Sequence, residues 1–123
     1  MNAIKISING DASVLKLTDA EPKPTPAAGQ ALVKIHAAGV NFVDIYQRRG
    51  TYPIKLPFIP GLEASGVVEA VGDKVADIRP GDRVAYVSHI GSYSEYTAID
   101  ADRLIPLPEI CRSKRGLRFP CRE

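Results

Sequence analysis

The sequence predicts one domain of the all-β class, a barrel or a sandwich of short strands with a single small helix. Three observations predict this class: about seven short apolar or alternating runs, frequent turn residues, and only one segment with helix signals. The chain has 123 residues, including 10 Gly and 10 Pro, and 45% of them are hydrophobic. That length suits one compact domain, and that composition excludes a disordered chain.

The first third of the chain predicts three strands joined by a turn and a connector. Residues 3–8 alternate between apolar and polar side chains, which indicates a half-buried strand. Asn9-Gly10-Asp11 predicts a turn, and residues 14–17 favour a returning strand. Three prolines make residues 21–29 an extended connector, because proline has no amide donor. Residues 31–40 then predict one long strand.

Residues 41–50 carry the signals of a short helix. Asn41 is a good N-cap, and Asp44 stands at the third helical position, where its carboxylate can bond back to the cap. Two arginines in the last turn suit the helix dipole, and Gly50 is a natural stop. We therefore predict a helix of about two turns in which Asp44 has a capping role.

The second half returns to short strands. Residues 52–60 contain three prolines and predict an irregular loop. Residues 61–72 are apolar and β-branched around Gly66, which predicts a strand that is bent, or closely approached by a neighbour, at that glycine. A turn at 78–83 is followed by three further short strands, at 84–87, 93–99 and 104–105.

Several kinds of site are excluded by what the residues lack. Residues 61–66 have the glycine spacing of a phosphate-binding loop but not the Lys and Ser or Thr that follow it. Ser65 and Ser94 are not on the strand-to-helix turn that a nucleophilic serine needs. His36 and His89 have no chelating partner pattern, so no metal site is predicted, and His36 is expected to face solvent or simply to be hydrogen-bonded.

The sequence also lacks the signals of membrane or secreted proteins. No run approaches the roughly 18 apolar residues of a membrane span, and the first residues do not form a signal peptide. Both cysteines, Cys111 and Cys121, lie in the last 13 residues, so residues 1–108 cannot form a disulfide framework. We expect a cytoplasmic protein that does not contact a membrane.

The C-terminal residues differ from the rest of the chain in charge. Residues 109–123 hold 5 of the 16 Lys and Arg and 2 of the 14 Asp and Glu, so the net charge of +2 comes from this end. We expect residues 110–123 to be disordered or loosely docked, because so many cations cannot form an apolar face. A basic tail can bind nucleic acid, although this one has no interleaved aromatic residues.

Two motifs carry a family resemblance. One is Gly61-x-Glu63-x-x-Gly66-Val67-Val68, continued by Val71-Gly72-Asp73-x-Val75, and the other is Pro80-Gly81-Asp82-Arg83-Val84. In this order and spacing they resemble the catalytic-domain signature of the medium-chain dehydrogenase/reductase superfamily. The resemblance covers residues 1–109 and implies a GroES-like, partly open barrel with one short helix. In the family a C-terminal segment completes that barrel. The resemblance therefore implies that the barrel of this chain is incomplete without the segment.

The branch of the superfamily follows from two positions. Zinc alcohol dehydrogenases place Cys and His ligands where this chain has Asn41 and Leu62, and neither residue can replace a zinc ligand. Residues 38–53 instead look like the zinc-free NADPH:quinone oxidoreductases related to zeta-crystallin. The resemblance implies NADPH as the cofactor, no zinc, and a quinone-type small molecule as the substrate.

The resemblance also implies roles for single residues. Asn41 matches the family asparagine near the nicotinamide, and Tyr46 and Tyr52 match tyrosines that line the nicotinamide and quinone pocket. No catalytic acid or base is assigned. Glu63 is expected to be buried in a strand and to need a cationic partner, with Arg48 and Arg49 as candidates.

The family pattern stops at the tail. Quinone oxidoreductases continue from a Leu-Pro-Glu such as residues 107–109 into an alanine-rich helix with a Phe-Glu near its start. One choice of codons for residues 110–123, read two bases later, encodes such a segment. We therefore hypothesise that the tail is that segment in a shifted reading frame.

Most of the NADPH is bound in the family by a Rossmann domain, and the chain contains no glycine-rich fingerprint of one. We therefore expect the chain alone to be inactive as a reductase. A barrel without its covering segment is also expected to self-associate. Two alternatives stay open: a non-enzymatic barrel module that lacks its cofactor domain, and weak nucleic-acid binding through the basic tail.

Overall fold

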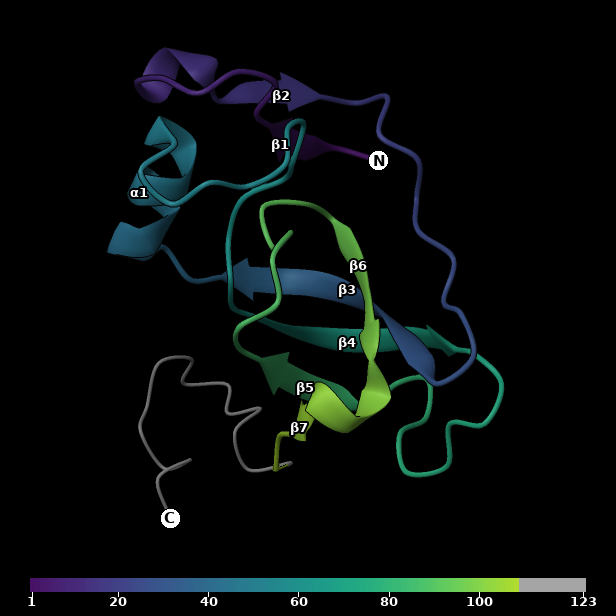
Figure 1. Ribbon diagram of the computed structural model, residues 1–123. Helices are drawn as coiled ribbons and strands as arrows, with labels where there is room; N and C mark the ends of the chain where they lie inside the picture. The colour runs from purple at the N-terminus through teal and green to yellow at the C-terminus, as the bar shows by residue number, and fades with distance from the viewer. Residues whose placement is uncertain (109–123) are drawn as a thin grey trace.

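The computed structural model describes residues 1–108 and is mainly β, as predicted (Figure 1). The predictions for residues 110–123 lie outside the described residues. The elements in chain order are β1 (Ala3–Lys5), η1 (Ala12–Val14), β2 (Lys16–Thr18), β3 (Gln30–Ala38), α1 (Phe42–Arg49), β4 (Ala64–Val71), β5 (Arg83–Tyr86), β6 (Tyr96–Asp100), η2 (Ala101–Arg103) and β7 (Ile105–Pro106).

The strands form two open antiparallel sheets. The larger sheet has the order β6-β3-β4-β5-β7, and the smaller one pairs β1 with β2. Figure 1 shows the small sheet and α1 at one end of the large sheet. Isolated bridges from Ala3 to Ser94 and from Ile6 to Phe58 tie the N-terminal strand to the rest of the domain.

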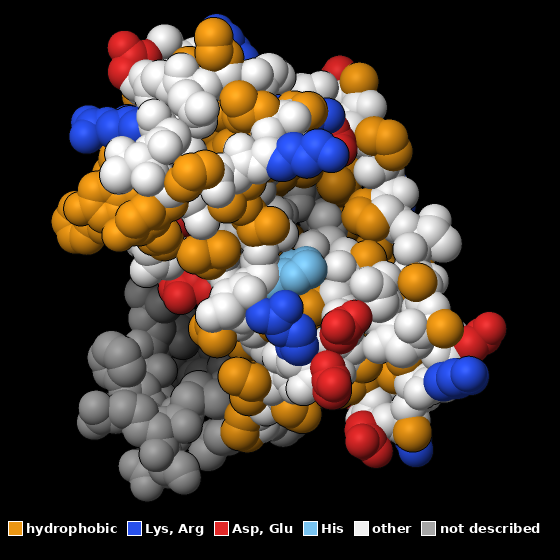
Figure 2. Space-filling view, in the orientation of Figure 1, with side chains coloured by type: hydrophobic (Ala, Val, Ile, Leu, Met, Phe, Trp, Pro, Cys, Tyr) orange, Lys and Arg blue, Asp and Glu red, His pale blue; other side chains and the backbone are white. Residues whose placement is uncertain are grey.

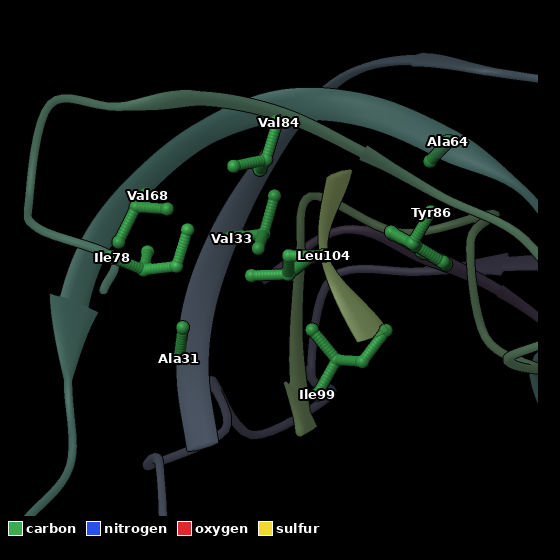
Figure 3. Packing of buried hydrophobic residues seen from close by; sticks show 9 residues of the cluster. All are labelled: Ala31, Val33, Ala64, Val68, Ile78, Val84, Tyr86, Ile99 and Leu104. Carbon is green, nitrogen blue, oxygen red and sulfur yellow. The ribbon is translucent and has the colours of Figure 1, made fainter. Parts of the chain in front are cut away.

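The hydrophobic core lies against one face of the curved large sheet (Figure 3). Strand alternation places Val33, Val68, Val84 and Ile99 on this face from four different strands, and each is almost completely buried. The loop residue Ile78 packs into the same cluster. The remaining members are Ala31, Ala64, Tyr86 and Leu104. This core holds together β3 and β4, the two strands between which α1 is connected.

Several strands are shorter than the sequence predicts. The first ends at Lys5, because Ile6 forms a single bridge to the proline loop at Phe58 rather than a ladder. The strand predicted at 93–99 begins only at Tyr96. In β3 the register shifts between Ile35 and Ala37, so His36 lies at an irregular position and is exposed, as predicted.

Gly66 is a point of close approach between two strands, which confirms the sequence prediction. It pairs with Ile35 in the β3–β4 ladder. A Cβ atom at this position would overlap the main-chain carbonyl oxygen of Lys34. Because a backbone atom cannot move aside as the end of a side chain can, the pairing of β3 with β4 requires a glycine here.

We predict that Gly66→Ala lowers the free energy of unfolding by about 1–3 kcal/mol, the usual cost of overpacking a closely packed site. Urea denaturation monitored by circular dichroism measures this loss. Ser65→Ala, one residue earlier in the same strand, serves as the control and should stay within about 0.5 kcal/mol of the original chain. Equal stability of the two variants would show that the close approach does not constrain the sheet.

Candidate functional site

Helix α1 buries polar side chains and exposes apolar ones. Asp44 and Gln47 are 6% and 8% exposed, whereas Phe42 and Tyr46 are 79% and 41% exposed. Figure 2 shows the hydrophobic side chains that gather over this end of the molecule. Since an amphipathic surface helix normally buries its apolar stripe, this helix must be held by polar contacts, and its apolar face is available for binding.

The N-terminal end of α1 is held by Asp44. Its Oδ2 atom accepts hydrogen bonds from the main-chain N–H of Asn41 at 3.0 Å and from the hydroxyl of Tyr93 at 2.6 Å. The predicted capping role of Asp44 is therefore confirmed. Burial raises the pKa of the Tyr93 hydroxyl, and the bond to Asp44 raises it further. The hydroxyl thus stays protonated and donates to the carboxylate over the ordinary pH range.

The C-terminal end of α1 leads into the aromatic pair. Gly50 has φ of 87°, a left-handed conformation that ends the helix, and the N–H of Tyr52 donates to the carbonyl oxygen of Tyr46 at 3.2 Å. The Tyr46 and Tyr52 rings meet edge to face, with centroids 5.4 Å apart. Tyr52 is 51% exposed, so both rings present a free surface.

Asn41 lies at the opposite end of α1 from the aromatic pair. The helix cap is made by the Asp44 carboxylate and by the main-chain carbonyl of Asn41, which accepts the N–H of Asp44 at 3.0 Å. Asn41 lines a pocket of about 370 Å³ together with Val40, Phe42 and Ile45. The structure therefore brings Tyr46 and Tyr52 into contact at the C-terminal end of α1, and it places Asn41 at the N-terminal end of the helix in a mainly apolar pocket.

The prediction for Glu63 is wrong in two respects. Glu63 precedes β4 and is partly exposed, because the strand begins only at Ala64. The ion pairs found within residues 1–108 are Lys5–Glu21 and Lys23–Glu69, and neither includes Glu63. The Glu63 carboxylate instead packs against Gly39, where a Cβ atom would overlap it.

Of the two candidate partners of Glu63, Arg48 makes a hydrogen bond elsewhere. The Nε atom of Arg48 donates to the carbonyl oxygen of Gly10 at 3.1 Å. Glu63 lines a shallow groove with Ala38, Ala85 and Val87, among others. Partial exposure to water at this groove lets the carboxylate remain solvated without an ion pair.

Two residues that position the site, and the burial of a third, were not identified from the sequence. Tyr93 contacts Asp44 across 49 positions, and Asn9 contacts the end of α1 across 38 and 39 positions. Gln47 is buried beside Asp44 on the same helix face. The spacing of Asp44 and Gln47 marks a polar face, but helical periodicity alone does not say which face of a short helix is buried.

Within residues 1–108, no group of three or more His, Cys, Asp or Glu side chains is arranged to hold a metal ion. In the same part of the chain, no helix has the length and apolar character needed to cross a membrane.

Residues 27–109 match the family model of the alcohol dehydrogenase GroES-like domain. The chain belongs to this family. It is 44% identical over 119 residues to the quinone oxidoreductase of Sus scrofa, an alignment that covers 94% of this chain and 36% of that protein. The probable quinone oxidoreductase of Schizosaccharomyces pombe is 47% identical over 98 residues, covering 78% of this chain and 29% of that protein.

A solved structure supports the same assignment. The Escherichia coli quinone oxidoreductase, crystallised as a complex with NADPH, has a TM-score of 0.85 and 38% sequence identity, covering 89% of this chain and 34% of that one. The GroES-like fold and the relation to quinone oxidoreductases of the medium-chain dehydrogenase/reductase superfamily, both predicted from the sequence, are thus confirmed. The chain spans about a third of the length of the relatives that it matches.

We predict that Tyr93→Phe lowers the free energy of unfolding by about 1–3 kcal/mol, because it leaves the buried Asp44 carboxylate without one of its two donors. Tyr52→Phe is the matched control, since the Tyr52 ring is half exposed, and should change stability by less than about 0.5 kcal/mol. Urea denaturation at neutral pH compares them. A similar loss in both variants would contradict the anchoring role of Tyr93.

The same variant has a predicted pH signature. The folded-state pKa of Tyr93 is raised, so its contribution to stability is present below the unfolded value of about 10 and is lost as pH rises above it. Burial also raises the pKa of Tyr86 to about 12, so Tyr86 too contributes to a fall in the free energy of unfolding as the pH rises. The free energy of unfolding should therefore fall less steeply above pH ~10 in Tyr93→Phe than in the original chain. Equal slopes of this free energy against pH in the two chains would contradict the role of the Tyr93 hydroxyl as a donor to Asp44.

Proposed function

We propose that this domain forms one wall of the active site of an NADPH-dependent quinone oxidoreductase, with Asn41, Tyr46 and Tyr52 facing the nicotinamide and the quinone. The observation that supports this most strongly is the half-exposed pair of tyrosine rings at the end of α1. A phenol combines a flat apolar face with a hydroxyl that donates a hydrogen bond, as a quinone ring with carbonyl oxygens requires. The relatives named as quinone oxidoreductases support the same substrate class.

The residues present fit a nicotinamide. The side chain of Asn41 offers both a donor and an acceptor for a carboxamide, and its neighbours Val40, Phe42 and Ile45 offer an apolar surface for a ring. When bound, NADPH supplies the hydride or electrons that reduce the quinone. The chain's own residues orient the two rings, exclude water through the apolar face of α1, and donate hydrogen bonds to the quinone oxygens from Tyr46 and Tyr52.

We infer that the rest of the cofactor is held outside residues 1–108 and that the chain alone does not turn over NADPH. Dinucleotides are usually anchored by their pyrophosphate at a glycine-rich turn before a helix. Helix α1 instead begins with Asn41 and the Asp44 carboxylate, which repels a phosphate. The greater length of the relatives is consistent with a second domain that supplies this anchor.

We also propose residues 1–109 as the extent of the domain and residues 110–123 as a segment outside it. The family match covers residues 27–109. The bridges at Ala3 and Ile6 support inclusion of the N-terminal residues, because both connect to the body of the domain.

The proposed site is tested by an NMR titration of the chain with NADPH and with duroquinone, a quinone that does not alkylate thiols. We predict shifts of the Tyr46 and Tyr52 ring signals and of the Asn41 side-chain amide, while Tyr86, which is 1% exposed, serves as an internal control. Tyr46→Ala should weaken duroquinone binding about tenfold, the loss typical of one buried aromatic contact. Shifts confined to other residues, or none at all, would favour the non-enzymatic module.

We propose that the exposed apolar face of α1 also makes the chain self-associate. Phe42, the first residue of α1, is 79% exposed, and Leu17 is 74% exposed in the separate strand β2. We predict that Phe42→Gln weakens association about tenfold, whereas Leu17→Gln has little effect. Sedimentation velocity over a range of concentrations measures this. A monomer at every concentration, or equal effects of the two variants, would contradict the proposal.

A further inference from the structure

The turn at Asn9 and Gly10 is docked on the C-terminal end of α1. The side-chain amide of Asn9 donates to the carbonyl oxygens of Gln47 at 3.4 Å and of Arg48 at 3.2 Å. The N–H of Gly10 donates to Arg48 O at 3.1 Å, and Nε of Arg48 donates back to Gly10 O at 3.1 Å. The turn therefore satisfies carbonyl groups that have no partner within the helix.

Asn9 is also the only asparagine of this chain that precedes a glycine. The other two, Asn2 and Asn41, precede Ala3 and Phe42. In an Asn-Gly pair the glycine nitrogen can attack the asparagine side-chain carbonyl, because glycine has no Cβ to obstruct the approach. Asn9 is exposed, so water can reach it.

We propose that Asn9 is a deamidation site. The folded turn of Asn9 and Gly10 holds the C-terminal end of α1, and deamidation of Asn9 releases that end irreversibly. The main-chain nitrogen of Gly10 forms a bond to Cγ of Asn9, and the Cγ–Nδ2 bond breaks with release of ammonia. The resulting five-membered imide is opened by one water molecule to aspartate or isoaspartate. The net reaction consumes one water and releases one ammonia, with no change in oxidation state.

The docked turn restrains this reaction. Both reacting nitrogens, Nδ2 of Asn9 and N of Gly10, are engaged by carbonyl oxygens of α1. The Asn9 amide also packs on Gly50, where an added Cβ atom would lie 3.0 Å from Cγ of Asn9. The turn must open before the nitrogen can attack, so the rate of modification follows the local opening of the turn.

The deamidated product cannot re-form the hydrogen bonds between residue 9 and the end of α1. Deamidation replaces the Asn9 donor with a carboxylate, which faces two carbonyl oxygens at the negative end of the helix dipole. Arg48 is the cation that contacts this turn, but its Nε atom already donates to Gly10 O. The modified turn is therefore expected to release the last turn of α1, to which Tyr46 belongs.

The test is to incubate the full chain at mildly alkaline pH, once folded and once in urea, and to follow each asparagine by peptide mass spectrometry. We expect the mass gain of one dalton to occur first at Asn9, and more slowly in the folded chain than in urea. Gly10→Ala should suppress it. Because the added Cβ atom would lie 2.9 Å from Cγ1 of Val14, the Gly10→Ala/Val14→Ala double variant provides the control in which this crowding is relieved.

The consequence for α1 is measured by hydrogen exchange of the aged chain and of Asn9→Asp, which carries the same charge. In both, amides of α1 should exchange about tenfold faster, the effect expected for the loss of hydrogen bonds to the last carbonyl groups of the helix, while amides of β3 should not change. Three results would overturn the proposal: earlier modification of Asn2 or Asn41, equal rates at Asn9 in the folded chain and in urea, or unchanged α1 exchange after deamidation. None of these measurements depends on NADPH or a quinone.

Discussion

The arrangement of the site depends on how helix α1 is fixed at its two ends. At the N-terminal end, Tyr93 and the main-chain N–H of Asn41 both donate to Oδ2 of Asp44. At the other end, the Asn9 and Gly10 turn donates to the last carbonyl groups. A helix of two turns has little stability of its own in water. These polar contacts allow it to keep an apolar face exposed, which apolar packing against the core would have buried.

This constraint connects the fold to the proposed chemistry. Strands β3 and β4 approach each other closely at Gly66, and α1 lies in the segment that connects these two strands. Tyr93 lies just before β6, and Asn9 lies between β1 and β2, so both sheets contribute one contact to the helix. The half-exposed ring of Tyr46 is thereby presented on a supported helix, and the ring of Tyr52 contacts it from the segment that follows the helix.

The sequence predicted the local features well and the long-range ones poorly. The bounds of α1, the capping role of Asp44 and the close approach at Gly66 follow from residue types and short spacings. The anchors Tyr93 and Asn9 could not be predicted, because each acts on a residue far away in the chain and neither has a motif of its own. The apolar neighbours of Glu63 predict that it lies in a buried strand, whereas β4 begins one residue later. The roles of Tyr46 and Tyr52 came from family resemblance, and their contact is visible only in the structure.

The most direct test of this account is the exchange rate of the Gly10 amide, measured by NMR in the original chain. Gly10 lies in a turn outside any strand or helix, and its N–H donates to the carbonyl oxygen of Arg48 in α1. If the turn holds the helix, the Gly10 amide should exchange as slowly as the amides of α1 and should be released together with them as urea is added. Exchange of Gly10 at the rate of an unprotected amide, while α1 stays protected, would show that the helix is held by something else.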